Sequence, residues 1–351
     1  MFQDRSYPTL LLRGLAAAVM VTLVFGASTS TSAFSAYNHG WDGTSDMRTA
    51  VDESGTELTV AQRVSRYDSV APRRTAAVVL SPTESYGTEA TVIREFVRAG
   101  GTLVVAEDYG TGGNDLLGNV GAEARFNGTA LRDERNAGPS PAFPRATAAG
   151  NHTYSQNVSG LMLNHGTVID PGNATPLFHS SPFSYLDENG NAELDTSETL
   201  RRYPVVTMEQ VGDGRVIAIS DPSIFLNAML AESDNQALLD SLATAHAQLL
   251  FDVSHATQLP LLIQIRVLLQ QSSVAMATAG IVSILAVFWL FTQPTSPAWL
   301  NRQPDAVDSP ELSTEAIAAG VRSRHPEWDD QRVQRVTDSL MSYRNQSGTD
   351  D

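Results

Sequence analysis

The chain has 351 residues, of which 39 are acidic and 23 are basic, so its formal net charge is -16. Every basic residue is Arg, and an acidic chain without Lys is typical of proteins that stay hydrated in concentrated salt. We therefore predict a halophilic origin. The charge excludes a broad basic surface for nucleic acid, and the absence of Cys excludes disulfides and thiolate chemistry.

Two apolar stretches, 15–27 and 273–292, bracket the chain. The second has no charged residue, and as a helix it would span a hydrocarbon core of roughly 30 Å. Arg5 and Arg13 precede the first, which places the N-terminus inside the cell; a signal anchor and a cleaved signal peptide both fit. The predicted parts are an N-terminal anchor or signal 1–37, an extracellular domain 38–271, a transmembrane helix 272–292, and a Pro-rich linker with a cytoplasmic helical tail 293–351.

The predicted exterior carries four Asn-x-Ser/Thr sequons, which are acceptors for N-glycosylation in exported proteins. They begin at Asn127, Asn151, Asn157 and Asn173. A single sequon is weak evidence, because sequons arise by chance in a Ser/Thr-rich chain, but the location of all four agrees with an exported domain. The partners that we predict for this domain are membrane lipid and other envelope proteins.

The outer domain opens with a strand–helix–strand pattern. The apolar run 75–83 ends in Ser-Pro, residues 86–101 show helical i, i+3, i+4 spacing before Gly100 and Gly101, and 102–108 is a second apolar run. Such a unit predicts parallel strands. Residues 214–223 predict another strand, 58–67 a strand or helix, and 326–343 a short amphipathic tail helix. We expect an α/β fold with an open, mostly parallel sheet, helices on both faces, transmembrane helices and a helical tail.

Several segments carry a family resemblance. They are LSPTESYGTEATVIREFVRAGGTLVVAEDYG, GNDLLGNVGAEARFNGTALRDERN, LNHGT, FSYLDENGNAELDTSETL and GRVIAISDPSIFLNAML. Over residues 38–260 they resemble haloarchaeal membrane proteins of the domain of unknown function 4350 family. The resemblance implies an extracellular domain similar to class I glutamine amidotransferases (flavodoxin-like), as in gliding-motility and ABC-transport accessory proteins, and an association with MoxR-type ATPases.

Amidotransferase chemistry itself is excluded, because those enzymes attack an amide with a cysteine thiolate and this chain has no Cys. We find no G-x-S-x-G motif that would supply a serine instead.

Residues 187–198 match the twelve-residue calcium loop. Oxygen-bearing residues stand at the positions that bind Ca²⁺: Asp187, Asn189, Asn191, Glu193, Asp195 and Glu198. Ala192 occupies the sixth position, where Gly is usual because the turn needs a positive φ. A calcium site and an acidic surface turn both fit this pattern, and Ca²⁺ is the one cofactor that we predict.

Polar residues follow three of the predicted strands, where ligands bind in doubly wound sheets. These candidate ligand-binding residues are Glu84, Glu107, Asp108 and Asp221. If the strands are neighbours, the residues form an acidic crevice; strand ends also become polar simply because they reach the surface. The cluster of Arg125, Arg132 and Arg135 fits an anion fork or structural ion pairs.

Gly110, Gly112 and Gly113 follow a predicted strand, but their spacing matches no phosphate-binding motif. We predict no catalytic residues and a membrane-anchored, extracellular binding or scaffolding domain of the archaeal cell envelope. The alternatives are an exported hydrolase that uses the strand-end carboxylates and an accessory subunit of a membrane transport complex.

Overall fold

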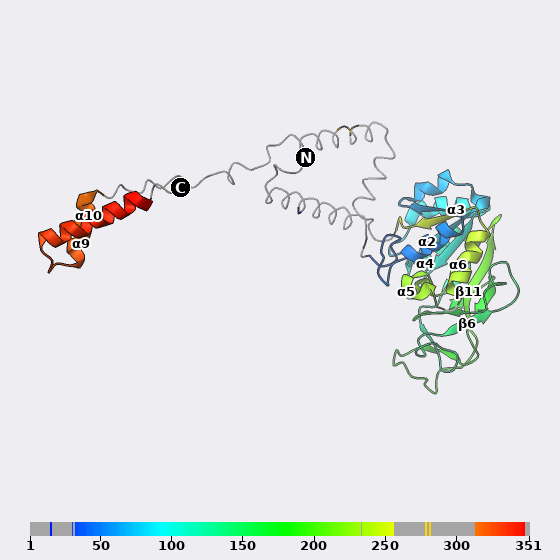
Figure 1. The fold of residues 1–351 in the computed structure, drawn as a ribbon. Helices are drawn as coiled ribbons and strands as arrows, with labels where there is room; N and C mark the ends of the chain where they lie inside the picture. The colour runs from blue at the N-terminus through cyan, green and yellow to red at the C-terminus, as the bar shows by residue number, and fades with distance from the viewer. Residues whose placement is uncertain are drawn as a thin grey trace. The chain divides into compact units, whose positions relative to one another are not determined.

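A computed structural model describes residues 15, 30, 32–232, 234–255, 278, 281 and 313–347 (Figure 1). The chain divides into two units, one of Ala16–Ala279 and one of Met1–Leu15 with Gly280–Asp351. The described part of the first unit is an α/β domain, and that of the second is a pair of helices near the C-terminus.

The helices of the α/β domain are α2 (Ser45–Glu53), α3 (Ala90–Arg98), α4 (Gly112–Val120), α5 (Asn227–Leu230) and α6 (Asn235–Thr244), with 3₁₀ turns η1 (Val64–Ser69), η2 (Pro72–Arg74), η3 (Gly87–Glu89) and η4 (Pro222–Phe225). Its strands are β1 (Glu57–Ala61), β2 (Thr75–Leu80), β3 (Thr102–Ala106), β4 (Arg125–Phe126), β5 (Ala130–Asp133), β6 (Arg145–Ala148), β7 (Leu161–Met162), β8 (Ile169–Asp170), β9 (Thr175–His179), β10 (Ser184–Asp187), β11 (Pro204–Val211), β12 (Gly214–Ile219) and β13 (Gln248–Asp252).

Nine strands form the main sheet in the order β1-β13-β2-β3-β12-β11-β9-β6-β7. The first five run parallel to one another. The predicted strand–helix–strand unit is present as β2, α3 and β3, because a helical crossover is the connection that parallel neighbours require. Parallel β3 and β12 therefore end at the same edge, with Ala106 paired to Ile219.

The other end of the sheet is antiparallel. Strands β12 and β11 pair antiparallel, as do β11 with β9, β9 with β6, and β6 with β7. The change of direction occurs at the tight turn between Val211 and Gly214, where Gly212 has a φ of 60°. A two-residue turn joins only antiparallel strands, so the Gly212-Asp213 pair is the sequence signal for this hairpin.

The predicted fold class is thus wrong in two respects. The sheet is mixed rather than mostly parallel. In addition, none of the helices among the described residues combines the length and apolar character needed to cross a membrane, so the predicted transmembrane helices are not upheld. Apart from residues 15, 278 and 281, the stretches 15–27 and 273–292 lie outside the described residues.

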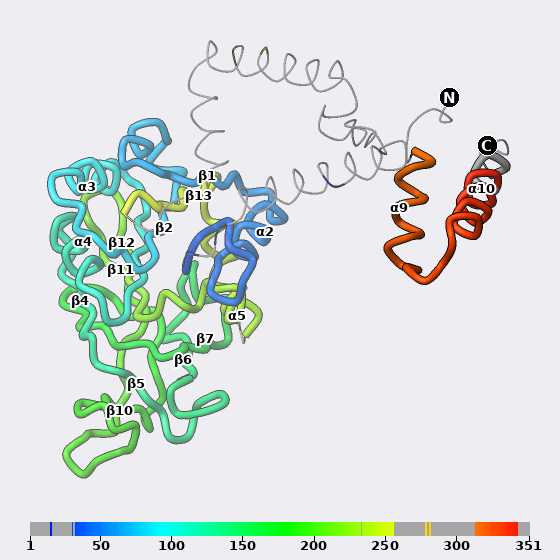
Figure 2. Tube along the Cα trace, turned by 90° about the vertical axis from the view of Figure 1, so that its left-hand side faces the viewer, coloured from blue at the N-terminus to red at the C-terminus, as the bar shows by residue number. Residues whose placement is uncertain are grey.

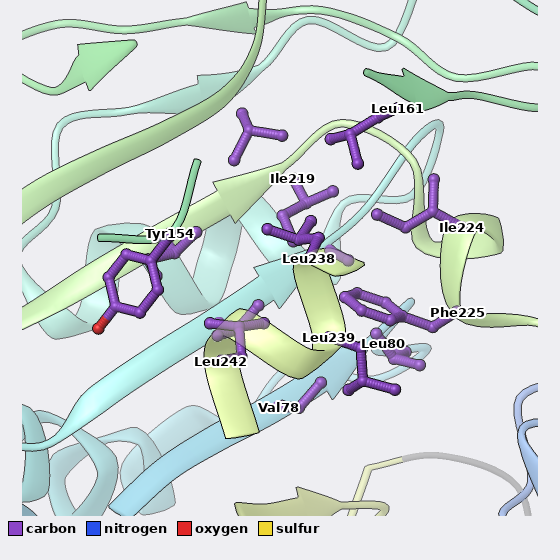
Figure 3. Packing of buried hydrophobic residues seen from close by; sticks show 14 of the residues in the cluster. Val78, Leu80, Tyr154, Leu161, Ile219, Ile224, Phe225, Leu238, Leu239 and Leu242 are labelled. Carbon is purple, nitrogen blue, oxygen red and sulfur yellow. The ribbon is translucent and has the colours of Figure 1, made fainter. Parts of the chain in front are cut away.

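The parallel half of the sheet is buried on both faces. Successive residues of β2 alternate between two apolar clusters, with Val78 in one and Val79 in the other. The first cluster includes Phe225 of η4 and Leu238, Leu239 and Leu242 of α6 (Figure 3). The second contains Ile93, Phe96 and Val97 of α3 with Leu116, Leu117 and Val120 of α4. Each fully buried side chain of this size contributes about 1.5–3 kcal/mol to stability.

The described C-terminal part is a hairpin of α9 (Thr314–Arg324) and α10 (Asp330–Ser347). Ser313 begins α9, since its side-chain oxygen accepts the Ala316 N–H at 3.3 Å. Val333 of α10 is buried, whereas Leu340 is half exposed. The tail helix predicted at 326–343 is therefore present, and it begins four residues later than the prediction.

Gly214, at the start of β12, lies close to the backbone of the connection between α3 and β3. A Cβ atom there would lie 2.1 Å from the Val97 carbonyl oxygen and 2.2 Å from that of Gly101. We expect Gly214→Ala to lower the free energy of unfolding by about 3 kcal/mol or more, because backbone atoms must move. The control is Gly55→Ala, where φ is 78° but no atom lies within 4 Å, and we expect a loss of about 1 kcal/mol. Equal losses in urea unfolding would contradict this packing.

Candidate functional site

Glu107 lies directly after β3, and its side chain is fully buried. Its Oε1 accepts the N–H groups of Asp108 at 3.1 Å and Gly110 at 3.3 Å, and its Oε2 accepts that of Gly113 at 3.4 Å. Burial raises the pKa of Glu107 against the opposing effect of these hydrogen bonds. The carboxylate is therefore an internal acceptor that closes the loop between β3 and α4.

This arrangement explains the Gly-rich loop that follows β3. A Cβ on Gly110 would lie 2.6 Å from Glu107 Oε2, and one on Gly113 would lie 2.8 Å from Glu107 Cβ. Loops of this kind hold phosphate in other proteins through backbone N–H groups. Here the anion that they hold is a side chain of the same chain.

Asp221 follows β12 and is also fully buried. Its Oδ2 accepts the Asn164 N–H at 2.5 Å, and its Oδ1 accepts the Ser223 N–H at 2.8 Å and the Ser223 hydroxyl. Burial, with a smaller contribution from the charge of Asp108, raises the pKa of Asp221 to about 7 against the opposing effect of these hydrogen bonds. Asp221 thus begins η4 and ties residue 164 to the end of β12.

The four predicted strand-end residues do not form an open crevice. Glu107, Asp108 and Asp221 do meet at one edge, because β3 and β12 are neighbours. Asp108 is partly exposed and accepts the Tyr109 N–H at 2.6 Å. Glu84 lies on the exposed loop after β2. Three of the four residues thus lie at one edge, and two of these, Glu107 and Asp221, are fully buried.

Tyr109 lies at the same edge, and the sequence alone did not single it out. Its hydroxyl donates to the carbonyl oxygen of His165, and 47% of the residue is exposed. Partial burial, followed by the charges of Asp108 and Asp221, raises the pKa of Tyr109 to about 12. An aromatic residue directly after two acids at a strand end is the signal that could have identified it.

A second buried carboxylate cluster was missed because β13 was not predicted. Asp252, the last residue of β13, accepts the hydroxyls of Tyr67 at 2.8 Å and Tyr86 at 3.2 Å through Oδ2. Burial, followed by the Asp252 charge, raises the pKa of both tyrosines. The apolar run before Asp252 could have revealed the strand, but the two tyrosines are distant in sequence.

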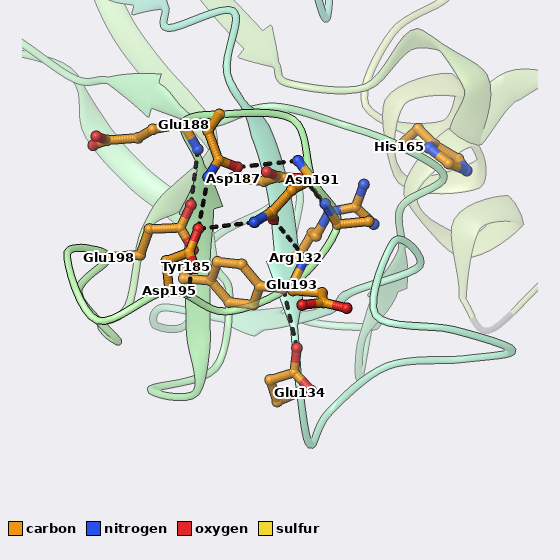
Figure 4. A network of polar contacts seen from close by, with 12 residues as sticks. Arg132, Glu134, His165, Tyr185, Asp187, Glu188, Asn191, Glu193, Asp195 and Glu198 are labelled. Carbon is orange, nitrogen blue, oxygen red and sulfur yellow. Dashed lines mark hydrogen bonds and ion pairs between the residues drawn. The ribbon is translucent and has the colours of Figure 1, made fainter.

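Residues 187–198, hereafter the acidic loop, begin at Asp187, the last residue of β10 (Figure 4). Asp187 Oδ2 accepts the Ala192 N–H at 3.0 Å, Asn189 Oδ1 accepts the Asn191 N–H at 3.0 Å, and Asn191 Oδ1 accepts the Glu193 N–H at 2.8 Å. Ala192 has a φ of 66°, so this residue adopts the left-handed conformation that usually requires Gly. The chain closes into the turn that the calcium-loop pattern predicts.

The far end of the acidic loop folds back onto its beginning. Glu198 accepts the N–H groups of Glu188 and Asp195, both at 3.0 Å, and Asp195 Oδ2 accepts the side-chain amides of Asn189 at 2.6 Å and Asn191 at 2.9 Å. Among the residues that the structure describes, no three His, Asp or Glu side chains come together as metal ligands. That statement concerns only His, Asp and Glu side chains, whereas Asn amide oxygens and backbone carbonyl oxygens also bind Ca²⁺.

Arg132 of β5 anchors the acidic loop from the neighbouring strand. Its Nε donates to Asp187 Oδ2 at 2.7 Å, and the Asp187 side chain has no exposed surface. Burial alone would raise the pKa of Asp187, but the hydrogen bonds from Arg132 and Ala192 outweigh it and lower that pKa. Arg125 instead donates to the carbonyls of Ala122 and Ala124. The predicted Arg cluster is thus divided among separate contacts.

A mixed sheet with helices on both faces and internally bonded strand ends defines this part of the chain as an α/β domain. A model for the family described as "Domain of unknown function (DUF4350)" matches residues 36–243. The chain therefore belongs to the DUF4350 family. No curated protein matches it.

Several solved structures show a distant similarity to part of this chain. The mmIFT52 N-terminal domain is 15% identical, with a TM-score of 0.38 over 50% of this chain and 77% of its own. Cytoplasmic protein STM1381 from Salmonella typhimurium LT2 is 14% identical, with a TM-score of 0.36 over 58% and 87%. The polyextremophilic beta-galactosidase from the Antarctic haloarchaeon Halorubrum lacusprofundi is 16% identical, with a TM-score of 0.28 over 48% and 22%. With TM-scores below 0.5, these similarities say nothing about the activity of this chain.

The raised pKa of Asp221 gives a pH dependence with a defined sign. Between its unfolded pKa near 4 and about 7, the folded state holds a proton that the unfolded state has lost. The contribution of Asp221 to stability is therefore highest below about pH 4 and falls as the pH rises through 7. We expect Asp221→Asn, which cannot titrate, to be less destabilising relative to wild type at pH 8 than at pH 5. Urea unfolding at constant ionic strength measures both differences, and equal differences would contradict the raised pKa.

Proposed function

We propose that residues 36–255 form a non-catalytic domain that binds or scaffolds a partner protein in the cell envelope. The observation that supports this most directly is the use of the strand-end carboxylates. Glu107 and Asp221 are fully buried and accept hydrogen bonds from their own chain. A general acid or base must reach the proton of a bound substrate, whereas these groups stabilise loops and the η4 turn.

The surface that we assign to recognition lies on residues 183–200, which follow β9 and include β10. Phe183, Leu194 and Leu200 on this segment are 37%, 40% and 43% exposed. The Arg135 guanidinium lies 4.9 Å from the centre of the Phe183 ring. Exposed apolar residues together with aromatic residues and Arg are typical of protein-binding surfaces.

The antiparallel strands carry this segment away from the buried core. Strand β10 pairs with β5 in a separate two-stranded sheet, and Figure 2 shows both at the opposite end of the domain from β1 and β13. A rigid sheet that presents a loop-rich surface is a common arrangement for binding.

We also propose that the domain is exported, and that its source is a haloarchaeon. The four sequon residues Asn127, Asn151, Asn157 and Asn173 are all exposed, as acceptors of glycans must be. The net charge of -16 and the absence of Lys support a halophilic source. The parallel strands β1, β13, β2, β3 and β12 support a relation to the glutamine amidotransferase-like fold. Ca²⁺ and the interaction with membrane lipid stay predictions.

The binding role predicts a loss of partner capture when the exposed apolar surface is changed. We would cross-link the full chain in native cells and compare wild type with the double variant Phe183→Ser and Leu200→Ser. Because both side chains are exposed, the unfolding midpoint should change little, whereas the yield of the specific cross-linked product should fall at least tenfold.

Trp41→Ser is the matched control, since Trp41 is 72% exposed but lies outside residues 183–200. We expect its cross-linking to equal wild type. If the double variant cross-links as well as wild type, residues 183–200 are not the recognition surface. If the wild-type chain yields no specific product, the binding role itself is wrong.

A further inference from the structure

One buried oxygen atom in the acidic loop has no hydrogen-bond partner. Asp187 Oδ2 accepts two hydrogen bonds, from Arg132 and Ala192, but Oδ1 accepts none among the described residues, and the side chain has no exposed surface. An unsatisfied buried carboxylate oxygen is rare and destabilising. The Asp at position 1 of a calcium loop uses its two oxygens in the same way: one accepts the backbone N–H of position 6 and so holds the turn, and the other binds the ion.

The remaining oxygen atoms of the acidic loop belong to residues at the matching positions. Asn189 and Asn191 stand at positions 3 and 5, Asp195 at position 9 and Glu198 at position 12, and position 7 supplies its backbone carbonyl, here that of Glu193. Each Asn oxygen accepts one backbone N–H and has a second lone pair. The set consists only of hard oxygen donors, which Ca²⁺ prefers.

The departure at position 6 does not prevent the turn. Ala192 adopts a φ of 66° and donates its N–H to Asp187 Oδ2, as the glycine at this position must. The strain of an alanine in the left-handed region is small. It lowers affinity without changing which oxygens face the ion.

We propose that residues 187–198 bind one Ca²⁺ ion, with Asp187 Oδ1 as its buried ligand and Glu198 as its bidentate ligand. On binding, Asp195 exchanges its hydrogen bonds with the Asn189 and Asn191 amides for contacts with the ion, and Asp195 and Glu198 move toward Asp187. The Asp187–Arg132 pair then connects the bound ion to β5. This site does not depend on the proposed partner-binding role.

The test is calorimetric titration of CaCl₂ into the EDTA-treated full chain at constant ionic strength, up to about 10 mM, since extracellular calcium modules bind in the 0.1–1 mM range. We expect one site per chain. Glu198→Gln should weaken binding at least tenfold because a bidentate carboxylate is lost. Ala192→Gly should bind as tightly as wild type or more tightly, because it relieves the positive-φ strain.

Glu188→Gln is the matched control, because Glu188 is an exposed residue at position 2, which supplies no side-chain ligand. It undergoes the same chemical change as Glu198→Gln and should bind within twofold of wild type. Thermal unfolding of the same proteins provides a second readout, with Ca²⁺ raising the midpoint of wild type and of Glu188→Gln but not of Glu198→Gln.

Three results would overturn the site: no heat of binding and no shift in midpoint with Ca²⁺; equal binding by the Glu188 and Glu198 variants, which would indicate general attraction to an acidic surface; or an equal response to MgCl₂. Mg²⁺ is the discriminating ion because it requires near-octahedral geometry and retains its water.

Discussion

Buried backbone N–H groups must find acceptors, and in this domain carboxylates at the ends of parallel strands supply several of them. Glu107 serves the loop after β3, and Asp221 serves η4 and residue 164. Both side chains are fully buried. These acceptors hold the connections that leave the sheet at this edge, together with backbone bonds such as the one from the Ser220 N–H to the Val205 carbonyl oxygen.

The same constraint decides what the strand ends can do chemically. In doubly wound sheets this edge is the usual ligand site, and an acid pair there would suggest catalysis. When the carboxylates point inward and their oxygens hold backbone donors, the edge is part of the scaffold. Of the residues at this edge discussed above, Asp108 and Tyr109 remain accessible.

The antiparallel strands add a second region to the domain, beyond the buried parallel half of the sheet. Strands β11, β9, β6 and β7 continue the parallel sheet. The acidic loop follows from β10, and the exposed side chains of Phe183, Leu194 and Leu200 lie on the same segment. Arg132 and Asp187 join the two strands of that pair through a contact with almost no exposed surface. In such surroundings an ion pair is strongly affected by loss of either partner, so the position of the acidic loop depends on β5.

Local patterns of the sequence were sufficient to predict the strand–helix–strand unit β2–α3–β3, strand β12 and the turn of the acidic loop. Each of these depends on periodicity or on hydrogen bonds that act over a few residues. The absence of Cys likewise excluded thiolate chemistry without any coordinates. Tertiary structure decided how far the antiparallel part of the sheet extends beyond the β11–β12 hairpin, since β7 is only two residues long and β9 pairs with β11 across a bulge. It also decided that Glu107 and Asp221 are internal acceptors and that Asp187 meets Arg132, because burial and pairing over 55 residues of chain arise only when distant segments pack together.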